Sequence, residues 1–188
     1  MEITRDKALE LFEDHIDSES LIKHCLAVEG AMRGCAEKFN EDVELWGVCG
    51  LLHDIDFQKW PNNHLEIAPQ ILKEAGYPKD FIEAILGHGD FTLVPRETQM
   101  AKCLYAVDQM ASFIIAVALM RPTKLEGMTA KSVKKKMKDK AFARAVDRDE
   151  MQKGADELGM DIGELISMVI DALQKRELEL NGMGISMM

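Results

Sequence analysis

The sequence of 188 residues is short of positive charge: 23 lysines and arginines face 33 aspartates and glutamates, for a formal net charge of −10. Binding to nucleic-acid polymers or to anionic membranes needs a cationic face, so this deficit argues against both kinds of partner. The N-terminus has no apolar stretch of the kind that a signal peptide contains. The longest apolar run, residues 110–120, is too short to span a bilayer and predicts a buried helix. We expect a soluble, cytoplasmic protein.

Paired cysteines are also missing. The four cysteines are Cys25, Cys35, Cys49 and Cys103, and none forms a C-x-x-C motif. Each lies in an apolar stretch, which is typical of reduced, buried thiols. The sequence also lacks a G-x-S-x-G motif and a Walker-type glycine loop. These absences argue against a serine hydrolase of that type and against a P-loop nucleotide site.

Strand patterns are absent as well, since no run of β-branched residues alternates with polar ones. The spacing of apolar residues is helical almost everywhere, and only five prolines interrupt it. The expected helices cover residues 4–14, 19–38, 42–53, 64–75, 79–87, 98–120, 129–138, 141–146, 148–157 and 161–180. We therefore predict an all-α protein, a single compact bundle of roughly eight to ten helices.

Several histidines and aspartates lie on the apolar sides of these expected helices. Asp108, for example, has Leu104 four residues before it and Ala111 three residues after it, and no lysine or arginine shares this stripe. A carboxylate in an apolar core costs several kcal/mol unless a cation or a proton compensates it. A divalent metal is the simplest compensation, and imidazole and carboxylate groups together suit Mn, Fe, Co, Ni or Zn. The candidate ligands are His24, His53, Asp54, His64, His88 and Asp108.

The order of these residues resembles the HD-domain superfamily of metal-dependent phosphohydrolases, whose motif is H…HD…D. His24, the adjacent pair His53 and Asp54, and Asp108 follow that order. Residues 50–56 (GLLHDID) are similar to the superfamily's HDIG-type sequence. His64, with the apolar helix expected after it, and His88 are similar to the additional histidines of the two-metal members. The resemblance covers residues 20–120.

The resemblance implies a single HD domain over residues 1–180. In it the motif-bearing core is residues 20–120, and accessory helices occupy residues 121–180. The composition of residues 181–188 predicts a frayed tail after this domain. It implies one or two divalent transition metal ions, with Mg also possible. His24, His53, Asp54 and Asp108 would bind the first ion, and His64 and His88 the second. Asp54 would bridge the two ions and orient the attacking hydroxide.

The implied activity is that of a phosphomonoesterase or phosphodiesterase. Its partner would be a small anionic phosphorylated metabolite, with a nucleotide as the expected class, and the protein would be a monomer or a homodimer. Two alternatives stay open. One is a diiron oxygenase of the same superfamily, which would use the same six ligands. The other is a non-catalytic HD module that binds a nucleotide or a metal.

Two positions depart from the superfamily's pattern. Asp56 stands where the HDIG sequence has glycine, and Phe57 stands where many members carry lysine, with Lys59 two residues later. The second departure puts any lysine-dependent chemistry in doubt. Asp56 is either a group that orients a metal-binding histidine or an exposed loop carboxylate.

Positive charge is concentrated in one segment, where six lysines occur within residues 131–140. Four of them share a helix face because they recur at positions i, i+3, i+4 and i+7; these are Lys131, Lys134, Lys135 and Lys138. This face is either a solvated surface or a cationic rim that holds an anionic substrate. For the second interpretation, the candidate substrate-binding residues are Arg121 and Lys131.

Overall fold

The computed structural model describes residues 3–188, which contain nine α-helices and no strand. The helices are α1 (Arg5–Glu13), α2 (Glu19–Phe39), α3 (Val43–Leu52), α4 (Ala68–Glu74), α5 (Lys79–Leu86), α6 (Gln99–Leu119), α7 (Ala130–Met137), α8 (Arg148–Leu158) and α9 (Ile162–Gly182), with short 3₁₀ turns at Pro61–Asn63 and Asp90–Thr92. The prediction of an all-α helical bundle is confirmed.

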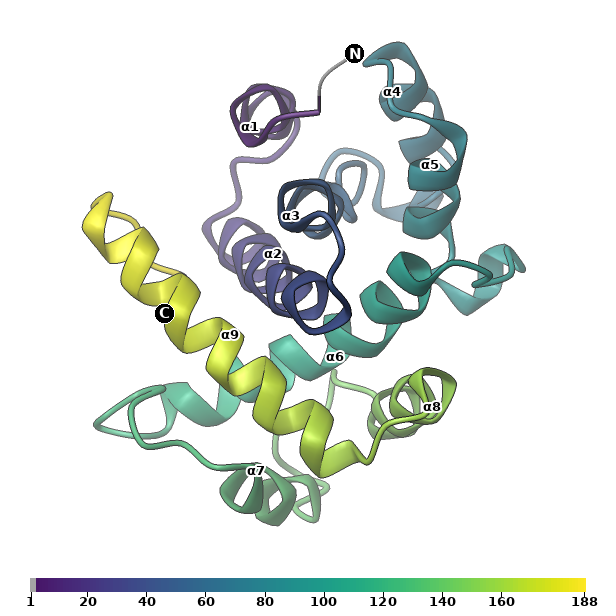
Figure 1. Cartoon of the computed structure of the whole chain (residues 1–188). Coiled ribbons are helices and arrows are strands. Elements are labelled where there is room, and N and C mark those ends of the chain that lie inside the picture. Colours follow the sequence, from purple (N-terminus) through teal and green to yellow (C-terminus); the bar gives the residue numbers. More distant parts are fainter. Residues whose placement is uncertain (1–2) are drawn as a thin grey trace.

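Helix α2 lies at the centre of the bundle, in contact with α3, α6 and α9 (Figure 1). Its contact with α3 is close because Gly50 has no side chain. A Cβ atom at this position would lie 2.7 Å from the carbonyl oxygen of Val28 and 2.9 Å from the backbone nitrogen of Glu29. The two helices that carry His24 and the His53–Asp54 pair are therefore packed backbone against backbone.

The buried carboxylate of Glu29 joins α2 to two other helices. Its oxygen Oε1 accepts hydrogen bonds from Arg5 on α1 at 2.7 Å, from Arg176 on α9 at 2.8 Å and from Arg33 on α2 itself at 3.1 Å. A buried charge is tolerated only when it is paired in this way. The network holds α2 in place a little more than one turn after His24.

Helix α6 is long and apolar enough to cross a bilayer, by length and composition alone. However, 61% of its most apolar window is buried inside the protein. The buried side chains include Met110, Phe113 and Ile114, which lie in the apolar run that predicted a buried helix. This helix forms one wall of the core and carries Asp108.

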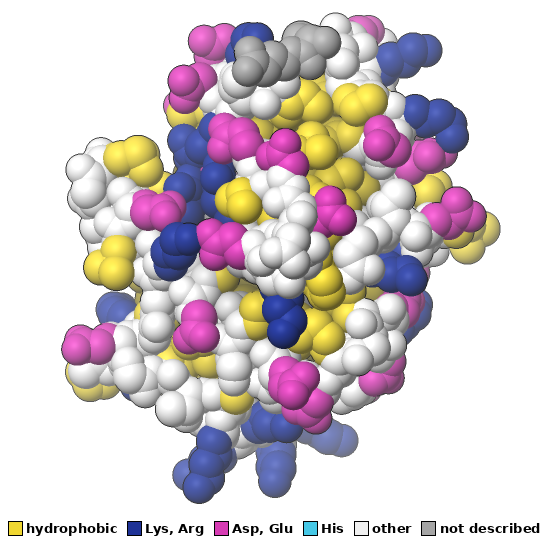
Figure 2. All heavy atoms as spheres, viewed as in Figure 1, with side chains coloured by type: hydrophobic (Ala, Val, Ile, Leu, Met, Phe, Trp, Pro, Cys, Tyr) yellow, Lys and Arg dark blue, Asp and Glu magenta, His cyan; other side chains and the backbone are white. Residues whose placement is uncertain are grey.

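Helix α7 carries the lysine-rich segment. Its single buried residue is Val133, and the four lysines expected to share a face are all exposed. In Figure 2 lysine and arginine side chains gather at the lower end of the molecule, where α7 lies in Figure 1. This segment is thus a charged outer face of the bundle.

Two predictions about the C-terminal third are wrong. Residues 141–146 form turns instead of a helix. The Arg148 guanidinium donates to the carbonyl oxygens of Phe142, Ala143 and Val146, and these bonds hold the segment in its turns. The tail after residue 180 is folded back instead of frayed. The Met187 amide donates to the Glu177 carboxylate at 3.0 Å, and the Met187 residue is only 1% exposed.

We predict that Gly50→Ala lowers the free energy of unfolding by about 1–3 kcal/mol, because the added methyl group overlaps backbone atoms that cannot move independently. Gly182→Ala is the matched control, since no atom lies within 4 Å of a Cβ at that helix position. The control should be neutral or stabilising by up to about 1 kcal/mol. Urea denaturation followed by circular dichroism measures both. Equal stability of Gly50→Ala and the wild type would contradict the close α2–α3 contact.

Candidate metal centre

The six candidate ligands come from five segments of the chain. His24 lies on α2 and Asp108 on α6, while His53 and Asp54 directly follow α3 and His88 follows α5. His64 was expected on a helix but lies in the loop before α4. Leu65 has a left-handed backbone with φ of 65°, which interrupts a helix at that point. The expected helix over residues 64–75 is corrected to Ala68–Glu74.

Four ligand atoms face one another in a first group. The Nε2 atom of His24 lies 3.0 Å from His53 Nε2, 3.3 Å from Asp108 Oδ1 and 3.5 Å from Asp54 Oδ2. His53 Nε2 lies 3.4 Å from Asp54 Oδ2. His53 Nε2 lies 3.8 Å from Asp108 Oδ1. Two atoms that bind one ion at about 2.1 Å lie roughly 3.0 Å apart when they are adjacent ligands and roughly 4.2 Å apart when they are opposite. The spacing of these four atoms fits a metal ion between them.

The other oxygen of the Asp54 carboxylate faces a second group. Asp54 Oδ1 lies 3.4 Å from Nε2 of His64 and 3.5 Å from Nε2 of His88. The two oxygens of a single carboxylate therefore face different pairs of imidazole nitrogens. Such an arrangement suits a carboxylate that bridges two ions.

The tautomers of three histidines are determined by their other ring nitrogen. Nδ1 of His53 donates to the Gly50 carbonyl oxygen at 2.8 Å, and Nδ1 of His88 donates to the Ile85 carbonyl oxygen at 2.6 Å. Nδ1 of His64 lies 2.8 Å from a carboxylate oxygen of Asp56. Because these oxygens only accept, the proton sits on Nδ1 and the Nε2 lone pair faces the centre.

Asp56 has a defined structural role. Its side chain is fully buried. Oδ1 accepts from His64, while Oδ2 accepts from the backbone amides of Ile67 and Ala68 at 3.2 and 2.8 Å. Asp56 thus orients His64 and also satisfies two free amides at the start of α4. Of the two interpretations of this residue, the exposed loop carboxylate is wrong.

Ser112 is a residue that the sequence did not reveal as part of the site. Its hydroxyl lies 3.0 Å from Nδ1 of His24, so it positions the fourth imidazole in the way that backbone carbonyls position two of the others. Two features of the sequence could have indicated this role. Ser112 is the only polar residue within the apolar run 110–120, and it lies one helical turn after Asp108.

The two buried carboxylates of the site influence the pKa values of its histidines. Burial lowers the pKa of His53 to about 4, so this ring is neutral near pH 7. Burial also acts to lower the pKa of His24, but hydrogen bonds to Asp108 and Asp54 outweigh it and raise this pKa to about 10. Burial acts to raise the pKa of Asp54, but the surrounding imidazoles hold it well below its usual value. With no ion bound, a proton on His24 partly balances the two carboxylates.

The ligand atoms open into a cavity of about 520 Å³. No lysine or arginine is among the described residues that line it. Besides five of the six candidate ligands, its walls contain Phe57, Gly89, Asp90, Phe91, Gln109, Ser112, Ala145, Val146 and Glu150. Phe57 is 43% exposed and Phe91 is 66% exposed. The cavity therefore combines aromatic surface with acidic groups.

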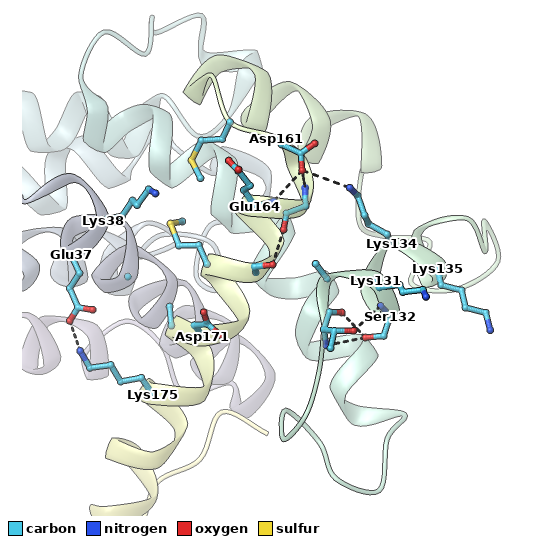
Figure 3. A pocket seen from close by; sticks show the side chains of 18 of the residues that line it. Glu37, Lys38, Lys131, Ser132, Lys134, Lys135, Asp161, Glu164, Asp171 and Lys175 are labelled. Carbon is cyan, nitrogen blue, oxygen red and sulfur yellow. Dashed lines mark hydrogen bonds and ion pairs between the residues drawn. The ribbon is translucent and has the colours of Figure 1, made fainter.

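The structure corrects the expectation that Arg121 and Lys131 help to bind substrate at this site, because neither lines the cavity. The Arg121 guanidinium donates to the carbonyl oxygens of Lys124 and Glu126, at 2.8 and 3.0 Å. Lys131 lines a different cavity of about 1480 Å³ between α2, α7 and α9. Figure 3 shows this second cavity.

The other cations that the sequence suggested are also directed elsewhere. In Figure 3, Lys134 reaches toward Asp161 at the start of α9, whereas Lys135 extends away from α9. The ammonium of Lys59 donates to the carbonyl oxygen of Asp14 at 2.6 Å and is not among the residues that line the metal cavity. Among the described residues, no lysine lines the metal cavity in place of the one replaced by Phe57.

Comparison with known proteins gives one match. A family model described as the HD domain matches residues 21–176, a range that contains all six candidate ligands. Neither a search of curated proteins nor a search of solved structures finds a match.

We predict that metal binding near neutral pH releases about one proton, because His24 is protonated in the metal-free protein and must be neutral to bind a metal. The affinity should rise with pH up to about the His24 pKa of 10. Calorimetric titration with Mn²⁺ in buffers of different ionisation enthalpy measures the release. His15→Ala, outside the cavity, should release the same number of protons as the wild type. Heats that do not depend on the buffer would contradict a protonated His24.

We also predict that Asp56→Asn weakens metal binding by about 10–100-fold, because the variant loses the charged partner that orients His64. Asp171→Asn, an exposed change on α9, is the control and should bind like the wild type. The same titrations measure both affinities, and circular dichroism checks that α4 still folds. Unchanged affinity in a folded Asp56→Asn protein would show that the orientation of His64 does not matter for metal binding.

Proposed function

The chain belongs to the HD-domain family, and on this premise we propose that it hydrolyses phosphate esters with one or two divalent metal ions. The observation that carries the proposal is the position of the Asp54 carboxylate. Its two oxygens face separate sets of imidazole nitrogens at 3.4–3.5 Å. Nitrogen and carboxylate donors of this kind suit Mn, Fe, Co, Ni or Zn.

The charge of the site favours an anionic substrate. Four neutral imidazoles and two carboxylates leave a net charge of roughly +2 when two divalent ions are present. Bound ions of this kind supply a Lewis acid, activate water at neutral pH and stabilise the entering and leaving oxygens of an in-line displacement. Phosphate esters are the substrate class that this chemistry serves.

The residues of the chain hold these groups in place. The rings of His53 and His88 are anchored to backbone carbonyls, and Asp54 follows directly on His53 at the end of α3. The Asp54 carboxylate lies among these anchored rings, with its two oxygens 3.4–3.5 Å from their Nε2 atoms. This arrangement supports a role for Asp54 in bridging the ions and orienting the attacking hydroxide.

The cavity suits a small phosphorylated metabolite. Its volume of about 520 Å³ lies within the range of small-molecule sites. The exposed faces of Phe57 and Phe91 offer stacking surfaces at its wall. A nucleotide, which joins a flat base to a phosphate, matches this combination best.

We predict that the wild-type protein, loaded separately with Mn, Co, Ni, Zn, Mg or Fe, hydrolyses members of a panel of phosphate esters and of cyclic and linear nucleotides. Asp54→Asn should lower kcat/KM by on the order of 10³-fold, because the ions lose their shared ligand. Asp171→Asn should keep wild-type activity. Phosphate release measures turnover, and elemental analysis measures the retained metal.

Other outcomes of the same experiment would contradict this function. Oxygen consumption by the iron-loaded protein without phosphate release would indicate the diiron oxygenase. Tight binding of an unhydrolysed nucleotide with every metal would indicate a non-catalytic module. Full activity and metal content in Asp54→Asn would place the site elsewhere.

A further inference from the structure

A second hollow lies beside the cavity of the candidate metal centre. It has a volume of about 320 Å³ and shares two wall residues, His24 and Phe57, with the larger cavity. Its remaining walls come from the start of α2 and from the loop after α3: Ser18, Ser20, Leu21, Gln58 and Pro61. The candidate ligand His24 therefore stands at the junction of two separate spaces.

Hydrogen bonds preorganise one wall of the smaller hollow. The side-chain oxygen of Gln58 accepts hydrogen bonds from the backbone amides of Asp17 and Ser18, at 3.0 and 2.9 Å. These bonds join the loop after α3 to the start of α2. With its polar end occupied in this way, Gln58 closes one side of the hollow and leaves Leu21 and Phe57 as apolar surface.

Neither hollow provides a cationic side chain, since no lysine or arginine is among the described residues that line them. The larger one contains two acidic residues that are not candidate ligands. Asp90 is paired with Arg96 at 2.9 Å and Lys153 at 2.6 Å, whereas the Glu150 carboxylate has no ion pair or hydrogen bond within residues 3–188. A substrate with several negative charges beyond those at the ions would face Glu150 without compensation.

We infer that the substrate of this site is a phosphodiester, with its phosphorus at the candidate ligands and one organic arm in each hollow. This inference rests on the proposed function. A diester carries one negative charge at phosphorus, whereas a monoester near neutral pH carries up to two and a nucleoside di- or triphosphate carries more. A monoester would also leave the smaller hollow empty. Shape and charge thus favour the same class.

The reaction on such a substrate is a hydrolysis that balances without a further reactant. The oxygen of water forms a new bond to phosphorus while the bond between phosphorus and one arm's oxygen breaks. That arm leaves as an alcohol and takes one proton from the water. The second water proton passes to the solvent, and the product is a phosphomonoester that keeps the other arm.

The test compares two substrates with the same leaving group, bis(p-nitrophenyl) phosphate and p-nitrophenyl phosphate, on the Mn²⁺-loaded full-length protein. We expect kcat/KM for the diester to exceed that for the monoester by at least about tenfold, since the second arm adds binding in the smaller hollow. Release of p-nitrophenol measures both reactions.

A variant tests the smaller hollow directly. Ser20→Trp places a large side chain in it and should lower the diester-to-monoester ratio of kcat/KM by about tenfold. In the Ser20→Trp variant, kcat/KM for methyl p-nitrophenyl phosphate, whose second arm is small, should fall less than kcat/KM for bis(p-nitrophenyl) phosphate. Ser167→Trp, which lines the distant cavity of Figure 3, is the matched control and should keep the wild-type ratio.

The failure of this inference can be distinguished from failure of the proposed function. A wild-type protein that hydrolyses the monoester as well as or better than the diester is a phosphohydrolase, but it overturns the diester assignment. An unchanged ratio in a folded Ser20→Trp protein also overturns it. Absence of hydrolysis of both substrates and of the wider ester panel, with every metal, overturns both proposals.

Discussion

Two carboxylates that lie almost entirely inside an all-helical protein set the constraint on which this site depends. Asp54 and Asp108 have side chains that are only 12% and 13% exposed, and no lysine or arginine pairs with either among the described residues. Their negative charge must be balanced from within the cluster. In the metal-free protein a proton on His24 supplies part of that balance, and a divalent ion would displace it.

The fold provides the rigidity that such a cluster needs. Gly50 lets α3 approach α2 until their backbones touch, and the carbonyl of the same residue determines the tautomer of His53. One glycine thus sets both the distance between two ligand-bearing helices and the direction of one lone pair. Asp56 has a comparable double role, because it orients His64 and begins α4. Packing and chemistry are coupled at these two positions.

Most of the helices could be predicted from the sequence, because apolar periodicity identifies the buried side of each one. The six candidate ligands followed from the polar residues on those sides together with the resemblance to the HD-domain motif. What could not be predicted depends on hydrogen bonds between individual side chains and the backbone of loops and turns. Asp56 accepts hydrogen bonds from amides at the start of α4, and His64 lies in the loop before that helix. Arg148 donates to carbonyl oxygens within residues 142–146. The Glu177 carboxylate accepts a hydrogen bond from the C-terminal tail. Each of these bonds joins a side chain to the backbone, and the spacing of apolar residues along the sequence does not reveal such bonds.

The lysine-rich segment shows a related limit. Its helical pattern was predicted from sequence, but the face it turns toward depends on how α7 packs against α9, and that packing directs it to a different cavity. The candidate metal site consequently has acidic and aromatic walls without a cationic rim. Because no lysine or arginine lines this cavity among the described residues, we expect bound metal ions to supply its affinity for an anion.

The most direct test of a two-metal centre is a crystal structure of the Mn²⁺-loaded protein with anomalous diffraction. We predict two anomalous peaks, one on either side of the Asp54 carboxylate. One should lie among His24, His53 and Asp108, and the other beside His64 and His88. A structure without a peak at Asp54, or with manganese bound only at other residues, would contradict it.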